Sequence, residues 1–193
     1  MGVIGGCLMF LVILAVLAAI WAIWRYNNLI TLKNQVTNAW KQIDVQLKRR
    51  HDLIPNLISS VKGEMQFEQD TLQKVIQARN SAVAARGVAD AAEKENQLTQ
   101  TLSRLFALAE NYPSLKANEA VKSLMEELSS TENKIGFARQ FYNDIATRFN
   151  IAQQVFPDSY IAKTFNFQPV ELFEIKEAAE REVPKVDLNL RPH

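Results

Sequence analysis

The chain has 193 residues, enough for a membrane-spanning segment followed by one domain. Its 22 basic and 21 acidic residues leave a formal net charge of +1, so bulk charge gives no reason to expect nucleic acid as a partner. The single cysteine, Cys7, excludes an intrachain disulfide framework and any zinc site that needs several cysteines.

An apolar stretch without any charge covers residues 3–24. About 20 apolar residues in a helix cross a hydrocarbon core of about 30 Å. Trp21 and Trp24 come at its end, where indoles suit the membrane interface, and Arg25 follows directly. We predict an uncleaved single-pass anchor over residues 1–25. A cleaved signal peptide fits less well, because the apolar stretch is long and no basic region precedes it.

Basic residues follow this stretch and none precedes it, with Arg25 and Lys33 the nearest. Membrane proteins keep such residues on the cytoplasmic side. The rule therefore predicts an N-terminus outside the cell and a large cytoplasmic part after the anchor.

The remainder is rich in good helix formers, and its apolar residues recur at steps of three and four. No sustained alternation of apolar and polar residues indicates a strand. Four amphipathic stretches are found, at residues 29–47, 54–79, 88–112 and 121–156. Their short connections predict an all-α fold in which the transmembrane helix continues into an antiparallel, up-and-down four-helix bundle over residues 26–157.

The stretch LKRRHDLIPN, from Leu47 to Asn56, combines basic residues with a proline inside this helical region. The apolar series continues onto Arg50 and then Ile54. A charge facing an apolar seam is costly unless it is paired, and an interior proline costs about 3 kcal/mol. Both penalties vanish if a helix ends near Arg50 and another begins near Ile54, with Asp52 as its cap and Pro55 in its first turn. We favour this corner over one long kinked helix.

A polar corner of this kind is a candidate docking surface. If the first helix is straight, Leu47 lies about 33 Å from Arg25 at 1.5 Å per residue, which is too far for contact with lipid headgroups. An acidic protein partner, or simply a helix end, is the better interpretation. The candidate binding residues are Lys48, Arg49, Arg50, Asp52 and Asn56.

Several stretches, taken together in this order and spacing, resemble the LemA family. They are YNNLITLKNQVTNAWKQIDVQLKRRHDLIPNLISSVKG from Tyr26, LAENYPSLKAN from Leu108, LSSTENKIGFARQFYND from Leu128, and Phe156-Pro157. The resemblance covers nearly the whole chain. It implies a membrane-anchored bundle of four helices in a bacterial inner membrane, and the family has no agreed catalytic residues to carry over.

No pattern of catalytic residues, metal ligands or cofactor-binding loops is recognisable, so we expect no enzyme, metal or cofactor. The two histidines, His51 and His193, both lack the glutamate three residues earlier that di-metal helical bundles use. For His51, which precedes Asp52, we prefer a polar residue at the helix corner to a pH-sensitive contact between the two.

Asparagine is a poor helix former, yet it recurs in the helical stretches. Asn133 and Asn143 lie beside the apolar seam and could fix register in an assembly, although exposed or capping positions are the ordinary explanation. Residues 158–193 form a separate C-terminal segment, with an acidic piece over 171–182 and an extended tail after Pro184. Its apolar cluster, predicted to cover the bundle or dock on a neighbour, comprises Phe165, Phe167, Val170, Leu172 and Phe173.

Two functional hypotheses remain open. The first is a non-enzymatic, membrane-anchored scaffold that forms homo-oligomers and organises membrane or partner proteins. The alternative is an adaptor or sensor that docks an unidentified protein, for example a protease, through residues 48–56. An enzyme of an unrecognised kind is the least favoured interpretation.

Overall fold

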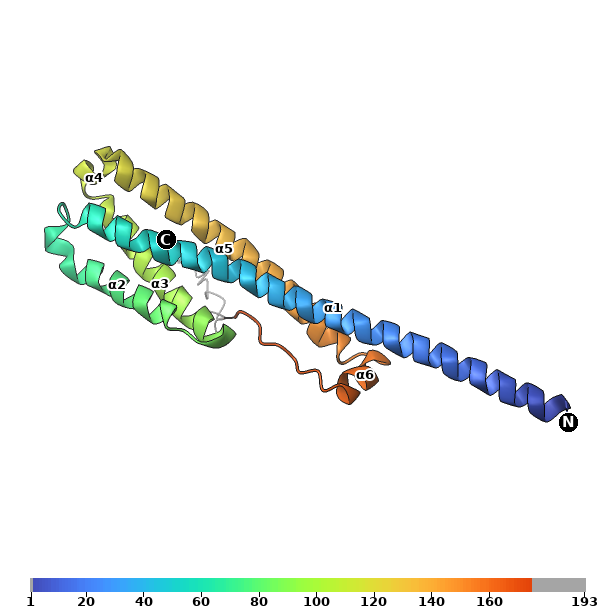
Figure 1. Ribbon diagram of the computed structural model, residues 1–193. Coiled ribbons are helices and arrows are strands. Elements are labelled where there is room, and N and C mark those ends of the chain that lie inside the picture. Colours follow the sequence, from blue (N-terminus) through green and yellow to red (C-terminus); the bar gives the residue numbers. More distant parts are fainter. Residues whose placement is uncertain (1, 175–193) are drawn as a thin grey trace, which may run out of the picture.

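The computed structural model describes residues 2–174, and every regular element in that range is helical (Figure 1). The prediction of an all-α protein with a long apolar N-terminal helix is confirmed. The elements are α1 (Gly2–Val61), the 3-10 helix η1 (Gln66–Glu68), α2 (Gln69–Val83), α3 (Gly87–Ala109), α4 (Pro113–Ala117), α5 (Glu119–Ala152) and α6 (Asp158–Thr164). The predicted extended tail, His193 and most of the acidic piece lie outside the described residues.

Helix α1 dominates the molecule. Its 60 residues correspond to a length of about 90 Å at 1.5 Å per residue. Its N-terminal part extends beyond the other helices (Figure 1). The large apolar side chains from Leu8 to Trp24 in this part are exposed. Within the described range, α1 is the one helix that is long and apolar enough to cross a membrane.

The predicted corner near Arg50 is wrong, because α1 continues through this position and contains Pro55 in its interior. The charge of Arg50 is paired, so it does not interrupt the helix. Pro55 has no N–H to donate to the carbonyl of His51, four residues earlier. That carbonyl instead accepts a hydrogen bond from Arg79 Nε on α2, at 3.2 Å. The proline thus leaves an acceptor available for a contact between helices.

The long helices lie side by side and alternate in direction along the chain (Figure 1). Helix α5 packs along α1, and α2 packs along α3, while α2 also contacts α1. The α2–α3 hairpin covers only the part of the α1/α5 pair that is distant from the N-terminus (Figure 1). Near the other end of the pair, the short helix α6 packs against α1.

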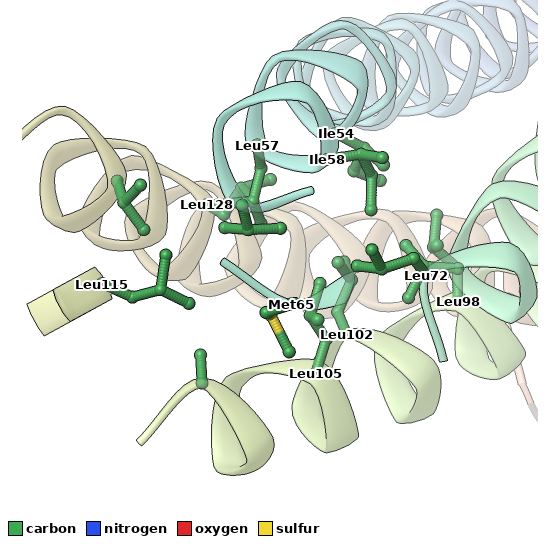
Figure 2. Close-up of a cluster of buried hydrophobic side chains, with 14 of the residues drawn as sticks. Ile54, Leu57, Ile58, Met65, Leu72, Leu98, Leu102, Leu105, Leu115 and Leu128 are labelled. Carbon is green, nitrogen blue, oxygen red and sulfur yellow. The ribbon is translucent and has the colours of Figure 1, made fainter. Parts of the chain in front are cut away.

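Two clusters of buried apolar side chains hold these helices together. The first lies at the distal end, where α1 meets α2, α3 and the start of α5 (Figure 2). The second lies between α1 and α5, closer to the apolar segment. Their positions follow the apolar series seen in the sequence, and the second also includes Phe173 from the C-terminal segment. This segment therefore packs against its own α1 and α5.

Candidate functional site

The predicted binding stretch contains one residue that is completely buried. Arg50 on α1 has no exposed surface, and its guanidinium binds the carboxylates of Glu95 on α3 and Glu132 on α5. It also donates to Thr99 Oγ1 on α3 at 2.9 Å. One side chain therefore links three helices, and Arg50 cannot belong to a docking surface. The burial of Arg50 argues against its predicted binding role, and partner binding by the rest of this stretch stays a prediction.

Glu95 is the second buried member of this group, with 1% of its surface exposed. Besides Arg50, it contacts His51, whose Nε2 lies 2.8 Å from Glu95 Oε1. Burial raises the pKa of Glu95, but the hydrogen bond from His51 and the positive charge of Arg50 outweigh burial and bring the pKa below its ordinary value. The carboxyl group is therefore ionised at neutral pH and accepts both hydrogen bonds.

The hydroxyl of Thr99 donates a hydrogen bond to Glu132 Oε1, at 3.0 Å. We call Arg50, His51, Glu95, Thr99 and Glu132 the Arg50 network. The partner of His51 is Glu95 on another helix, and Asp52 is exposed, in keeping with the preference against a contact between His51 and Asp52. His51 nevertheless lies within α1 and not at a corner. The network connects oppositely charged groups to one another, as buried charges require.

The other predicted binding residues lie on the surface of α1. Lys48, Asp52 and Asn56 are exposed and follow one another at intervals of four, which places them on one face of the helix. Lys48 borders a cleft of about 380 Å³ whose lining includes His51 and Glu95. Arg49 lies outside this face and pairs with Glu127 on α5, at 2.6 Å. The five predicted residues therefore do not form one site.

An extended segment, residues 167–173, lies on the α1/α5 pair, and we call it the strap. Two asparagine side chains of α5 hold its backbone. Asn150 accepts from the N–H of Val170 at 2.9 Å and donates to its carbonyl at 2.8 Å. Asn143 makes the same pair of hydrogen bonds with Phe173, at 2.7 and 3.1 Å. Each amide thus satisfies one residue of the strap as a neighbouring β-strand would.

The side chains of the strap are recognised by aromatic and cationic groups. The Phe173 ring lies 6.0 Å from the ring of Trp40 and 4.6 Å from the guanidinium of Arg139. Burial, together with nearby Arg50, lowers the pKa of Arg139 from its ordinary value. Tyr142 donates to the carbonyl of Glu171 at 2.7 Å. The strap therefore extends the core beyond the end of the α2–α3 hairpin.

Sequence reasoning placed Asn143 beside the seam but did not identify its partner, and it missed Asn150 as a second residue of the same kind. The interval of seven between them keeps both on one face of α5, which is the signal that could have linked them. Asn133, the other candidate for a register role, is exposed.

The opposite face of the α1/α5 pair carries a groove of about 560 Å³, which we call the outer groove. Val45, Phe137 and Phe141 line it and remain 62%, 73% and 47% exposed. Lys41 and Lys134 also line the groove. The two phenylalanines are four residues apart and lie outside the buried series of α5, a signal that sequence reasoning also missed.

Nothing in the described part of the chain gathers three or more histidine, cysteine, aspartate or glutamate side chains in a geometry suited to a metal ion. The Arg50 network is an internal cross-link, the strap contacts form a backbone clamp, and the outer groove is a largely apolar surface. Each is suited to binding and positioning of helices or chains.

Replacing Arg50 alone should destabilise the protein by about 3–5 kcal/mol, because Glu95 would remain buried without its main partner. The double variant Arg50→Met/Glu95→Met should recover most of this loss. Because the pKa of Glu95 is lowered on folding, its contribution is present above about pH 4.5 and is lost as the pH falls through the folded-state value. Urea unfolding in detergent across this range checks both effects. An Arg50→Met variant as stable as the parent would contradict this role.

The two strap asparagines should control the opening of the strap. The double variant Asn143→Ala/Asn150→Ala removes four hydrogen bonds, each contributing about 0.5–1.5 kcal/mol. We expect the amides of Val170 and Phe173 to lose most of their protection from hydrogen exchange while those of α5 keep it. Asn133→Ala, an exposed asparagine of the same helix, serves as the control. Equal protection in all three proteins would exclude the clamp.

Comparison with known proteins places this architecture in a family. The LemA family model matches residues 39–188. A protein LemA from Metamycoplasma hominis is 27% identical, in an alignment that covers 94% of this chain and 83% of that protein. The magnetosome protein MamQ from Magnetospirillum gryphiswaldense is 24% identical, with 87% and 72% covered. Because the family model spans most of the sequence, the chain belongs to the LemA family.

Proposed function

We propose that this protein is a non-enzymatic, single-pass membrane scaffold that self-associates in the bacterial inner membrane and organises membrane or partner proteins. The observation that carries the proposal is the continuity of α1. One helix runs without a break from the apolar segment into the packed helices after residue 25, which we call the body. The orientation of the anchor therefore fixes that of the outer groove.

Anchoring in one bilayer would align neighbouring copies. Their α1 helices are then roughly parallel, and Val45 lies at the same height in each, about 30 Å beyond Arg25 at 1.5 Å per residue. The outer groove follows the length of α1 and α5, so it faces sideways toward a neighbour. Exposed aromatic side chains such as Phe137 and Phe141 are typical of the buried centre of protein interfaces. A second copy is therefore the proposed occupant of this groove.

The relatives named LemA and MamQ, the second a magnetosome protein, support the proposed membrane-associated role. The alternating directions of α1, α2, α3 and α5 support an up-and-down four-helix bundle as the body of the scaffold. Basic residues after the apolar segment favour a cytoplasmic body, with the N-terminus outside. The proposed domains remain an anchor over residues 1–25, a bundle over 26–157 and a C-terminal segment over 158–193.

The outer groove can be tested in the purified protein. Extracted in mild detergent, the full chain should form particles larger than one copy, and Phe137→Ser/Phe141→Ser should shift them toward monomers by about tenfold or more in dissociation constant. Both residues are exposed, so helicity should be unchanged. Val83→Ser, an exposed apolar residue of α2, is the matched control. Mass photometry over a concentration series measures the distribution, and monomers of the unaltered chain at every concentration would refute self-association.

A second proposed function is that of an adaptor, based on the exposed face of Lys48, Asp52 and Asn56 beside the cleft. Lys48→Glu should abolish retention of a protein partner in pull-downs from membranes, because it reverses the charge at the cleft. Lys62→Glu makes the same change in the turn directly after α1, at a residue that does not line the cleft. Equal retention by the two variants would remove Lys48 from the docking surface.

A further inference from the structure

A second group of exposed apolar side chains lies at the opposite end of the body from the α4 turn. These side chains lie at the end of α5, in the loop after it and in α6, and we call this surface the α5–α6 end. Phe156 is 81% exposed, Tyr160 72% and Phe165 56%, and Ile151 and Val155 are about half exposed. Several large apolar groups within so short a stretch are unusual on a surface that faces only water.

The position of α6 along α1 indicates what this surface faces. Asp158, the first residue of α6, is 5% exposed, and its Oδ1 lies 3.3 Å from Arg25 Nε. Directly after α6, the ring of Phe165 lies 4.5 Å from that of Tyr26. Figure 1 shows α6 beside α1 where the helix leaves the body. Helix α6 is therefore fixed at the level of Arg25 and Tyr26.

Arg25 also marks the expected membrane boundary. It directly follows the apolar segment, and its guanidinium lies over the rings of Trp24 and Trp21, with centroid distances of 5.0 and 5.7 Å. Indole rings and arginine side chains both prefer the interfacial region of a bilayer. The same arginine thus connects the anchor's aromatic end to α6.

The dimensions of a bilayer then leave little room between α6 and the lipid. The headgroup region on each side of the hydrocarbon core is about 5–8 Å thick, and a helix with its side chains is about 10 Å wide. A helix bound to Arg25 at this boundary must touch the headgroups. Exposed tyrosine and phenylalanine side chains suit that environment, and the exposed Lys163 of α6 suits anionic headgroups.

We propose that the α5–α6 end is a second membrane-contact surface, which inserts Phe156 and Tyr160 into the interface of the same bilayer that α1 spans. The inference rests on the proposed anchoring by α1, and it adds a second attachment point. With both α1 and the α5–α6 end in contact with it, the bilayer fixes the tilt and rotation of α1 as well as its depth. The face of the body turned toward neighbouring copies is then also fixed.

Depth-dependent quenching tests this contact in the full chain. A Cys7→Ser background receives one new cysteine, Tyr160→Cys, which carries the fluorophore NBD. The protein is reconstituted in phosphatidylcholine–phosphatidylglycerol vesicles that contain lipids with a nitroxide near the headgroup. We expect a blue-shifted emission and quenching several-fold stronger than at Asn133→Cys, an exposed site on α5 that lies about 30 Å from the end of this helix at 1.5 Å per residue.

A label at Trp24→Cys tests the anchor independently of the loop. If this label is quenched and the Tyr160 label is no more quenched than the Asn133 label, the second contact is refuted while the anchor stands. If the Trp24 label is not quenched either, the proposed anchoring itself fails. A blue-shifted but unquenched Tyr160 label would show that protein, such as a second copy, covers the surface, and would also overturn the proposal.

The aromatic side chains should be responsible for the contact. With the label moved to Lys163→Cys, the additional change Phe156→Ser/Tyr160→Ser should reduce quenching to the level of the Asn133 label, while circular dichroism remains unchanged. The pair Phe137→Ser/Phe141→Ser, in the outer groove, should leave it unchanged. Strong quenching that survives the Phe156/Tyr160 change would argue against insertion of these two residues.

Discussion

The pairing of Arg50 with Glu95 and Glu132 is the interaction on which the arrangement of the helices depends. An unpaired guanidinium at this position would have to reach water, and α1 would have to end or turn there. Because carboxylates from α3 and α5 meet it, α1 can bury this residue and continue for three further turns to Val61. Those turns carry Ile54 and Leu57 into the distal core shown in Figure 2. The pairing of Arg50 therefore allows the end of α1 to pack into the distal apolar core.

Because α1 is unbroken, the position of its apolar segment in the membrane determines the position of the helices packed against the rest of α1. The groups attached to it include α6 through Arg25, the strap through Trp40 and the hairpin through Arg50. Each uses a different chemistry: an ion pair at the edge of the apolar segment, aromatic packing, and a buried charge network. Since all are fixed to one rigid helix, their heights above the bilayer are fixed relative to one another. This fixed geometry supports the proposed role as a scaffold.

Apolar periodicity predicted the helices and most of the buried side chains, because residues at intervals of three and four share one helix face. It could not predict the continuity of α1. Arg50 and Glu95 occupied apolar positions of two different stretches, and a single stretch does not reveal that its charged residue faces one on another helix. A single stretch also does not reveal that the carbonyl of His51, which Pro55 leaves without its helical donor, accepts a hydrogen bond from Arg79. The interval of seven could have linked Asn143 with Asn150, but it could not reveal the strap, because the two side chains bind backbone atoms that any residue would supply.

The outer groove and the α5–α6 end impose a joint constraint on any assembly. If α6 rests on the bilayer, rotation of the body about α1 is restricted, and the outer groove cannot turn freely to meet a partner. Copies can then associate only in those arrangements that keep every α6 on the lipid surface. Neighbours related by an axis along the membrane normal satisfy this condition, whereas antiparallel pairs do not. The two proposed contacts, at different heights along α1, would together favour lateral, parallel association within the membrane.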